Sequence, residues 1–520
     1  MTRITSKVAA AVLLASLLSA CGGGKDTPIE PPPVRIPTAS IALGAATGTV
    51  QAGNSTTIAV TLTRGGGFAG EVALAVTGAP TGVTVSAQTV AAGATTATLN
   101  VVTTTAAVAG TSTLTVAGTG TGVTIASQTV ALTVTAPALP IAQIGSDITN
   151  GDIGFAGAIA LSTDGTRMVV GASQSANGTT RVYQRTGTTW TQLGADIIGE
   201  AAGDYAGISV DINAAGTRIA IGAYRNSGNG TEAGHVRVYD LVGSTWTQVG
   251  ADMDGNVQSG FGTRFGWRVA LSGSGNRLIA SAAFANTGFA RVYDLVGGTW
   301  TQVGATFTVS GINGYGDAVD VSSDGTTVAV SAPIAQFSSA AGSVFVYRLV
   351  GGAWTQVGNV LTGTQTTTNM GETFGDAISL TATGSRIAIS APRNNEGAPV
   401  GSNFPTGQVR VFDLVGSTWT QVGNSVNGIT DVNGNADRLG ETLMISDDGT
   451  RWAANGPTNT IARVYTLVAG AWTQTGATIV GTTGLSARSE GLGLSPDGKT
   501  VAVGYVNGTP RRVRTFNIAP

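Results

Sequence analysis

Residues that could carry acid–base chemistry are few and scattered in this 520-residue chain. The single histidine, His235, has no serine partner marked by a local motif, so we expect a hydrogen-bonded or exposed surface histidine rather than a catalytic base. The carboxylates between the repeats described below are Glu200, Asp204, Asp254, Asp317, Glu372 and Glu441. Two of them facing each other across a central channel could serve a glycosidase or lyase, but no spacing selects a pair. The sequence therefore predicts no catalytic residue and a protein that is not an enzyme.

One loop places oxygen ligands at alternate positions, as calcium requires. Its candidate ligands are Asp431, Asn433, Asn435 and Asp437. The same residue types are common in plain polar loops, so a calcium site and an ordinary loop both stay open. Calcium is the only cofactor that we consider, because one cysteine and one histidine exclude disulfides and Cys/His zinc clusters.

Length and charge limit the classes of protein that fit. A chain of 520 residues exceeds what one hydrophobic core supports, and its 42% apolar content argues against disorder. The net charge of −2 gives no electrostatic reason to expect a nucleic-acid partner. We therefore expect several folded domains that bind no nucleic acid.

The N-terminus has the layout of an export signal. A basic start precedes an apolar run, Val8 to Leu18, that is too short to remain as a membrane span. The run ends Leu18-Ser19-Ala20-Cys21, which resembles the lipobox of bacterial lipoproteins. The resemblance implies that residues 1–20 are removed, that Cys21 is lipidated, and that Gly22 after it directs the protein to the bacterial outer membrane. A secreted protein whose cleavage site merely precedes a cysteine is the alternative.

Two regions follow the lipidation site. Residues 21–37 are rich in glycine and proline and predict a flexible tether. Residues 38–137 alternate apolar and polar positions, as in Thr57 to Thr63, between glycine-rich turns, which predicts a two-sheet β-sandwich. The segment Phe68 to Ser86 with its closing strand Gln128 to Val134 resembles bacterial immunoglobulin-like domains. A spacer is favoured over an adhesion domain, because a Thr/Ala surface offers few strong contact residues.

Residues 138–520 repeat one unit. A glycine closes a short turn at Gly165, Gly216, Gly275, Gly325, Gly384, Gly449 and Gly498. A later Arg-Val-Tyr-like strand is followed by Trp-Thr-Gln, which starts at Trp190, Trp246, Trp300, Trp354, Trp419 and Trp472. Four strands per unit at this spacing predict a seven-bladed β-propeller. The sixth Trp-Thr-Gln is the last, so we expect Gln143 to Asp147 to pair with Arg514 to Ile518 and close the ring.

An aromatic residue or leucine stands ten residues before most of the turns and is usually followed by glycine. Examples are Phe265-Gly266 and Phe374-Gly375. Together with motifs such as Ser331-Ala332-Pro333, these resemble FG-GAP repeats, the unit of the integrin α-subunit propeller. The resemblance implies an extracellular propeller that binds protein or carbohydrate, with calcium in some blades. The short Asp-Gly turns lack the acidic residues of the integrin-type calcium loops, so we do not expect those sites here.

The fold class is thus predicted as all-β, an immunoglobulin-like sandwich followed by a seven-bladed propeller. Short turns lie on one face of the ring and long, unequal loops on the other, where binding is expected. Candidate exposed aromatic contacts there are Tyr224, Phe261, Phe284, Phe337 and Phe404. The repeated arginines, Arg181, Arg237, Arg291, Arg410 and Arg463, are expected to pair with Asp240, Asp294 and Asp413, and the tryptophans to pack between blades. The predicted partner is an extracellular protein or glycan, with a carbohydrate-active enzyme or an envelope scaffold as alternatives.

Overall fold

The computed structural model describes residues 35–45, 47–104, 106–135, 141–258, 261–283, 288–310, 312, 314–333, 341–364, 371–396, 405–430, 436–456, 461–480, 489–506 and 510–518; at 258, 261, 489 and 490 it describes the backbone alone. The predicted signal peptide, Cys21 and most of the tether lie outside these residues. Every regular element in the described part is a β-strand. No helix among the described residues has the length and apolarity needed to cross a bilayer.

The first folded part is a pair of β-sheets. One sheet contains, in spatial order, β1 (Thr38–Leu43), β3 (Ser55–Gly65), β7 (Thr96–Thr103) and β5 (Val83–Val85). The other contains β2 (Thr47–Gln51), β10 (Gln128–Thr135), β8 (Gly110–Gly120), β4 (Val72–Thr77) and β6 (Gln88–Val90), with β9 (Val123–Thr124) beside β8. Ile58, Val60 and Leu62 are buried while their neighbours face solvent, as the alternation predicts. Side chains of both sheets share one core, but β10 and β2 pair in parallel rather than antiparallel.

The second part contains seven sheets of four or five strands among the described residues. The first strand of each lies innermost, and the strands follow outward in chain order. The first three sheets are β13 (Phe155–Leu161), β14 (Arg167–Ala172), β15 (Thr179–Thr186), β16 (Thr189–Gln192); β18 (Ser209–Ile212), β19 (Arg218–Ala223), β20 (His235–Val242), β21 (Thr245–Gln248); and β25 (Val269–Leu271), β26 (Arg277–Ala282), β27 (Phe289–Val296), β28 (Thr299–Gln302).

The next three sheets repeat this order. They are β29 (Val319–Val321), β30 (Thr327–Ala332), β31 (Ser343–Val350), β32 (Ala353–Gln356); β34 (Ile378–Leu380), β35 (Arg386–Ala391), β36 (Gln408–Val415), β37 (Thr418–Gln421); and β39 (Leu443–Ile445), β40 (Arg451–Gly456), β41 (Ile461–Val468), β42 (Ala471–Val480). In four sheets a short additional strand pairs beside the third strand; these are β17 (Ile197–Ile198), β22 (Met253–Asp254), β33 (Leu361–Thr362) and β38 (Val426–Asn427). Separately, β23 (Val257–Gln258) pairs with β24 (Phe261–Gly262).

The seventh sheet joins the two ends of the repeat region. It contains β43 (Ser489–Leu494), β44 (Thr500–Tyr505) and β45 (Arg511–Ile518), with β11 (Ile141–Gln143) and β12 (Ile148–Asn150) added beside β45. Gln143 lies opposite Phe516, and the Ile144 amide donates to the Thr515 carbonyl at 2.7 Å. The predicted pairing of these two segments is therefore confirmed.

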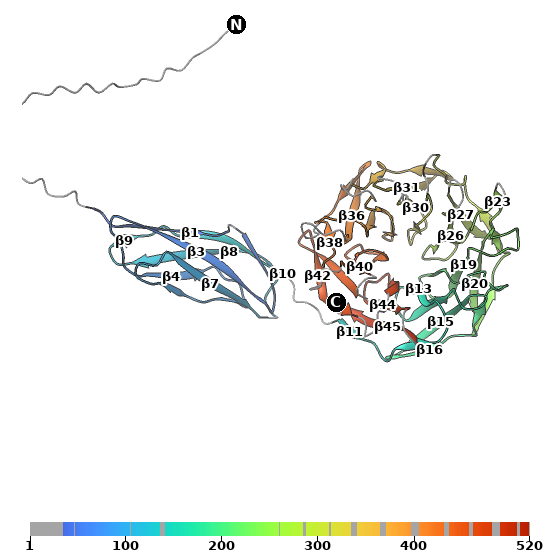
Figure 1. Cartoon of the computed structure of the whole chain (residues 1–520), viewed down its shortest axis with the longest axis horizontal. Helices are drawn as coiled ribbons and strands as arrows, with labels where there is room; N and C mark the ends of the chain where they lie inside the picture. The colour runs from blue at the N-terminus through green and yellow to red at the C-terminus, as the bar shows by residue number, and fades with distance from the viewer. Residues whose placement is uncertain are drawn as a thin grey trace, which may run out of the picture.

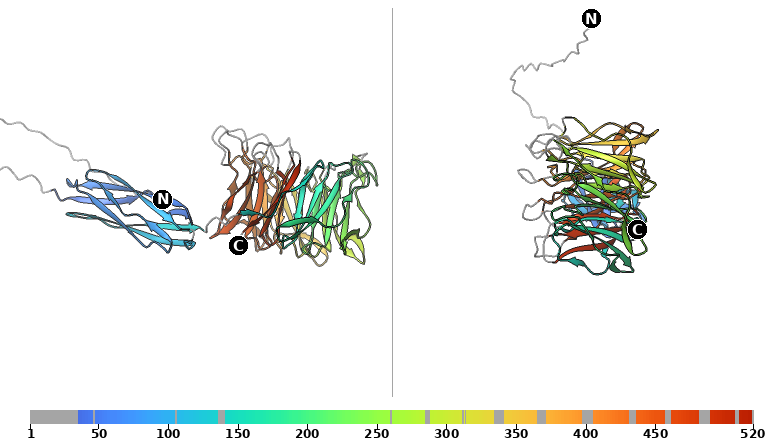
Figure 2. Two further views of the ribbon diagram at one scale, coloured as in Figure 1. Left: turned by 90° about the horizontal axis from the view of Figure 1, so that it is seen from below. Right: turned by 90° about the vertical axis from the view of Figure 1, so that its right-hand side faces the viewer.

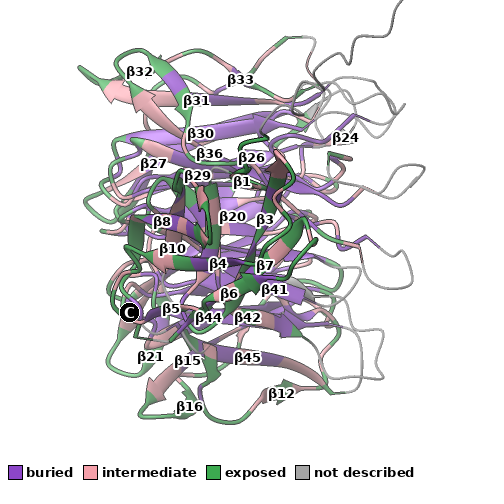
Figure 3. Cartoon of the chain, turned by 90° about the vertical axis from the view of Figure 1, so that its left-hand side faces the viewer, coloured by how far each residue is buried: buried purple, intermediate pink, exposed green. Residues whose placement is uncertain are grey.

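The sheets form a closed ring (Figure 1). Each innermost strand contacts the innermost strand of the next sheet, and β43 contacts β13 to complete the circle. Seen edge-on, the strands run between two faces of the ring (Figure 2). Buried residues follow the strands, whereas exposed residues gather at the turns and loops (Figure 3). The architecture is all-β and propeller-like.

The tryptophans of the fourth strands link neighbouring sheets, as predicted. The indole N–H of Trp300 donates to the Val249 carbonyl of the preceding sheet at 3.0 Å. Equivalent bonds join Trp246 to Leu193, Trp354 to Val303, Trp419 to Val357 and Trp472 to Val422. Trp190 reaches the Thr515 hydroxyl across the seam at 2.8 Å. Each indole thus satisfies a polar group while its ring packs between sheets.

On the short-turn face, hydrogen bonds link the turns to one another. All seven turn glycines have φ between 61° and 74°, which a side chain would disfavour. The amide of Thr163 donates to the Ala214 carbonyl, that of Ala214 to Gly273, and that of Gly273 to Ser323. Four further amide-to-carbonyl bonds complete the circle: Asp324 to Ala382, Ala382 to Asp447, Asp447 to Pro496 and Asp497 to Thr163. Backbone groups on this face are used for structure.

Candidate functional site

The long-loop face of the ring lies opposite the short turns and contains the segments that lead into the innermost strands. Here a left-handed residue precedes the buried aromatic position of the repeat. Two sheets use Gly154 and Gly314, but four use residues with side chains, namely Tyr205, Arg264, Thr373 and Arg438, at φ between 54° and 58°. A side chain in this conformation costs free energy, and such positions concentrate at functional sites. This rim of the ring is therefore our first candidate site.

Three aromatic rings gather on the rim. Tyr224 lies edge-on between Tyr205 and Trp267, with ring centroids 5.5 and 5.3 Å away. The guanidinium of Arg225 lies 4.9 Å from the Tyr205 centroid, and that of Arg268 lies 4.5 Å from the Trp267 centroid. Tyr205 and Trp267 are partly exposed, so the group presents aromatic surface beside positive charge.

Carboxylates from three successive sheets continue the rim. The Trp267 indole donates to Asp317 at 2.9 Å, and Arg438 pairs with Glu441. Asp376 lies near both acids: burial, and then the charges of Asp317 and Glu441, raise the pKa of Asp376 to about 8, although Arg268 and Arg438 oppose this. We name Tyr205, Tyr224, Trp267, Arg268, Asp317, Asp376, Arg438 and Glu441 the rim cluster.

Two further acids with raised pKa values serve the ring itself. Asp211 accepts the Leu271 amide of the next sheet at 2.6 Å, and Asp320 accepts the Leu380 amide in the same way. Burial raises the pKa of Asp211 to about 6 and that of Asp320 to about 7. Both carboxylates accept a hydrogen bond from a backbone amide at the edge of the next innermost strand. We therefore assign both acids a structural role.

The prediction that the repeated arginines pair with Asp240, Asp294 and Asp413 is wrong. Asp240 pairs with Arg218 at 2.5 Å rather than with Arg237, and Asp294 and Asp413 pair with Arg277 and Arg386. Each of these pairs lies directly opposite across two strands, as Arg218 and Asp240 do. Arg237 and Asp240 are three residues apart on one strand, so their side chains point to opposite faces of the sheet.

Four of the five repeated arginines instead pair with loop acids on the long-loop side, whereas Arg291 bonds to the Thr306 hydroxyl at 3.3 Å. Arg410 binds Glu372 at 2.7 Å and Arg463 binds Asp437 at 2.7 Å, with all four side chains almost fully buried. Glu372 is thus an internal ion-pair partner. Burial raises the pKa of Asp437, although Arg463 opposes the effect. Asp431, Asn433 and Asn435 lie outside the described residues, so the calcium site stays a prediction.

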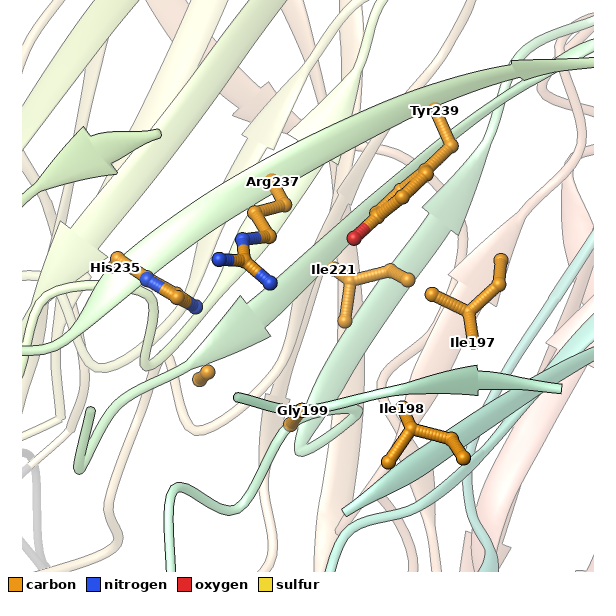
Figure 4. Close-up of a pocket in the computed structure, with 9 residues that line it drawn as sticks. Ile197, Ile198, Gly199, Ile221, His235, Arg237 and Tyr239 are labelled. Carbon is orange, nitrogen blue, oxygen red and sulfur yellow. The ribbon is translucent and has the colours of Figure 1, made fainter. Parts of the chain in front are cut away.

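A second group of chemical side chains surrounds the start of β20. His235 is only 2% exposed, and Glu200, Asp204, Asp252 and Asp254 lie around it. Burial lowers the pKa of His235 although the neighbouring acids oppose it, so the imidazole is neutral at neutral pH. A small pocket beside it is lined by Ile197, Ile198, Gly199, Ala206, Ile221, Ala223, His235, Arg237 and Tyr239 (Figure 4).

The predicted aromatic contacts are only partly placed by the structure. Tyr224 was expected to be exposed, and this is wrong: Tyr205 and Trp267 cover its ring, leaving 8% exposed. Phe284, Phe337 and Phe404 lie outside the described residues, and for Phe261 only the backbone is described, in β24. Whether these residues contact a ligand stays a prediction.

The sequence analysis missed Tyr205, Trp267, Arg268 and Asp376. Tyr205, Trp267 and Asp376 directly flank the repeated aromatic–glycine position or its equivalent, and Arg268 follows Trp267. The sequence contained a signal for these residues, because the aromatic–glycine pair recurs in most repeats whereas the residues beside it differ between repeats. Among the predicted carboxylates, Asp317 and Glu441 both lie near Asp376 on the rim, while Glu200, Asp204 and Asp254 lie near His235.

Comparison with known proteins gives only distant likenesses. No protein-family profile matches the chain, and no curated protein shows significant similarity to it. Similar solved structures include a periplasmic gluconolactonase from Pseudomonas aeruginosa (13% identity, TM-score 0.43, 86% of this chain and 100% of that one) and an oligogalacturonate lyase from Vibrio parahaemolyticus (10%, 0.42, 73% and 93%). The WD40 domain of a Toxoplasma gondii coronin is a third (7%, 0.43, 74% and 89%). Likeness at this level assigns no activity.

Proposed function

We propose that this protein is a lipid-anchored binding protein of the bacterial outer membrane. In this proposal Cys21 carries the lipid, the tether and an immunoglobulin-like spacer follow, and a seven-bladed propeller of the FG-GAP type presents the rim cluster to a glycan. The lipid, the membrane and the repeat type rest on the sequence motifs given above. The ligand class rests on the rim cluster.

The rim cluster has the mixed chemistry that carbohydrate recognition requires. A sugar ring offers a weakly apolar face and a periphery of hydroxyl groups. Tyr205 and Trp267 supply aromatic surface, and Asp317 and Arg268 supply hydrogen-bond acceptors and donors beside it. The left-handed backbone at Tyr205 holds one of these rings on the rim at an energetic cost. Glycan binding is the use of this surface that accounts for these features together.

A glycan array tests the proposal. The full chain carrying Cys21→Ser, which blocks lipidation, is compared with the same chain carrying Trp267→Ala. We expect a glycan bound by the parent and at least about tenfold weaker binding by the variant, the effect of losing a central aromatic contact. Val415→Ala is the matched control, because Val415 is 65% exposed at a strand end on the short-turn face. Binding that survives Trp267→Ala, or capture of a protein but no glycan, would refute the proposal.

A carbohydrate-active enzyme is the second candidate, and one observation favours it. Asp376, with a pKa raised to about 8, lies near Asp317 and Glu441, so its carboxyl would be protonated at neutral pH beside two further carboxyl groups. That is the pairing that acid–base cleavage of a glycosidic bond uses. If a bound glycan is cleaved, Asp376→Asn should abolish cleavage while leaving binding intact; equal turnover by the variant would exclude this role.

A further inference from the structure

The side chains around His235 come from separate segments that meet on the long-loop side. His235 is the first residue of β20, Asp252 stands just before β22, and Glu200 follows β17 on the way from the first sheet to the second. His235 lies opposite Asp254 in the β20–β22 pairing. None of these residues belongs to the rim cluster, so they form a distinct group.

The distances suit a shared ion. The Nδ1 atom of His235 lies 3.4 Å from Asp252 Oδ2 and 3.9 Å from Glu200 Oε2. One ligand atom from each of the three residues can be chosen so that all lie within 4.8 Å of one another. Tetrahedral ligand atoms at about 2.0–2.2 Å from a metal ion lie about 3.3–3.6 Å apart, so the distance from His235 to Asp252 already fits and the longer separations would shorten slightly on binding.

The imidazole is buried without a hydrogen-bond partner among the described residues. His235 is 2% exposed, and both carboxylate oxygens facing Nδ1 lie beyond normal hydrogen-bond length. An imidazole nitrogen that faces two carboxylates at these distances is a combination of ligand types that metal sites in proteins use.

The local charge also favours a cation. Glu200, Asp204, Asp252 and Asp254 surround His235, and the nearest positive group is Arg237. Arg237 contacts Glu200 Oε1 and lies 3.0 Å from Asp252 Oδ2. The amide of Asn226 donates to Glu200 Oε2 at 3.0 Å and to Asp204 at 3.1 Å, holding both acids in place. One guanidinium leaves most of this negative charge uncompensated.

The first sheet provides a natural comparison. There Arg181 binds two carboxylates, Asp152 at 2.7 Å and Asp196 at 2.6 Å, in the place where Arg237 binds Glu200 and Asp252. Thr179 stands at the position of His235, two residues before the arginine. The same Arg–carboxylate arrangement therefore exists without an imidazole, and His235 is what distinguishes the second sheet.

We propose that Glu200, His235 and Asp252 bind a first-row transition-metal dication, with Zn²⁺ as the best match. One imidazole nitrogen with carboxylate oxygens suits Zn²⁺, whereas Ca²⁺ prefers oxygen ligands alone. Three protein ligands leave a fourth position of a tetrahedral ion for water or a ligand group. The pocket lined by His235, Arg237 and Tyr239 has room for roughly one water molecule beside the imidazole (Figure 4).

Zn²⁺ titration of the full chain tests this site. The protein carries Cys21→Ser, which removes the only thiol, and no histidine tag, so His235 is the sole imidazole. After treatment with a chelator, calorimetry should show one saturable Zn²⁺ site, and Zn²⁺ should raise the melting temperature. Ca²⁺ at the same concentration should do neither.

Three variants decide the outcome. His235→Thr copies the first sheet and should weaken Zn²⁺ binding at least about 100-fold. Glu200→Gln, at a carboxylate that is 43% exposed, should weaken it at least about tenfold. Asp196→Asn, the matched change in the first sheet, should leave the affinity unchanged. If His235→Thr does not fold, Glu200→Gln still decides. Parent-like affinity in Glu200→Gln, or no Zn²⁺ binding by the parent below millimolar concentration, would overturn the proposal.

Discussion

Replacing Asp376 by asparagine should change how stability depends on pH. Burial, with the charges of Asp317 and Glu441, raises the pKa of Asp376 in the folded protein to about 8. In the unfolded chain that pKa returns to about 3.9. Between these values the folded state holds a proton that the unfolded state has released, so the wild type loses stability as pH rises from about 4 to about 8.

The size of the effect follows from this difference. One full proton corresponds to about 1.4 kcal/mol per pH unit. Asp376 is partly exposed, so solvent screening reduces the effect, and we expect roughly half of that value. Between pH 5 and pH 7 the Asp376 side chain should therefore cost the folded protein about 1.5 kcal/mol, a loss that asparagine, which does not titrate, avoids.

Urea unfolding at pH 5 and pH 7 measures this difference directly. The free energy of unfolding of Asp376→Asn should fall less between the two pH values than that of the wild type. Asp164→Asn is the control: hydrogen bonds from Thr166 and Ser162 outweigh burial and lower the pKa of Asp164, so its titration lies below this pH range. Equal pH dependence in Asp376→Asn and the wild type would show that Asp376 is ionised throughout, and would remove the basis of its acid role.

Two further substitutions test how the ring is held together. Trp300→Phe removes the N–H donated to the Val249 carbonyl and should cost about 1–3 kcal/mol in urea unfolding; a loss below about 0.5 kcal/mol would mean that the indole bond is not needed. Asp147→Asn removes the ion pairs to Arg512 and Arg514 at the seam. Burial alone would raise the pKa of Asp147, but hydrogen bonds from Arg514 and Gln143 outweigh it and lower that pKa, so its stabilisation is present above about pH 4 and lost at lower pH. The melting temperature of this variant should be below that of the wild type at pH 7 and equal to it near pH 2; a constant difference would argue against the ionic contribution.

The arrangement of the strands could be predicted because it depends on spacing. Each turn glycine fixes the end of a first strand, and each tryptophan fixes the start of a fourth. Counting these positions was enough to place Gln143 beside Phe516, although the two residues lie at opposite ends of the repeat region. Register in a sheet is set by such local rules, so a repeated sequence reports it several times over.

Side-chain partners across different sheets could not be predicted in this way. Arg237 finds Glu200 and Asp252 in loops whose paths no local pattern fixes. The error over Asp240 was avoidable, because an odd separation on one strand puts two side chains on opposite faces. The left-handed backbone at Tyr205 was not predictable, because glycine is the residue whose presence in a sequence indicates that conformation.

Residues on the short-turn face of the ring are needed for structure, whereas residues on the long-loop face are free to vary between repeats. We therefore expect binding on the long-loop face. The turns on one face bond to one another in a closed circle, so a change there disturbs the ring itself. On the other face, positions repeat where they are structural and vary where they are not. The residue two before the strand arginine, or its equivalent, is Thr179, His235, Phe289, Ser343, Gln408, Ile461 or Arg512. A repeat protein needs only one copy of a binding residue, so His235, the single imidazole of the chain, is the one to test first.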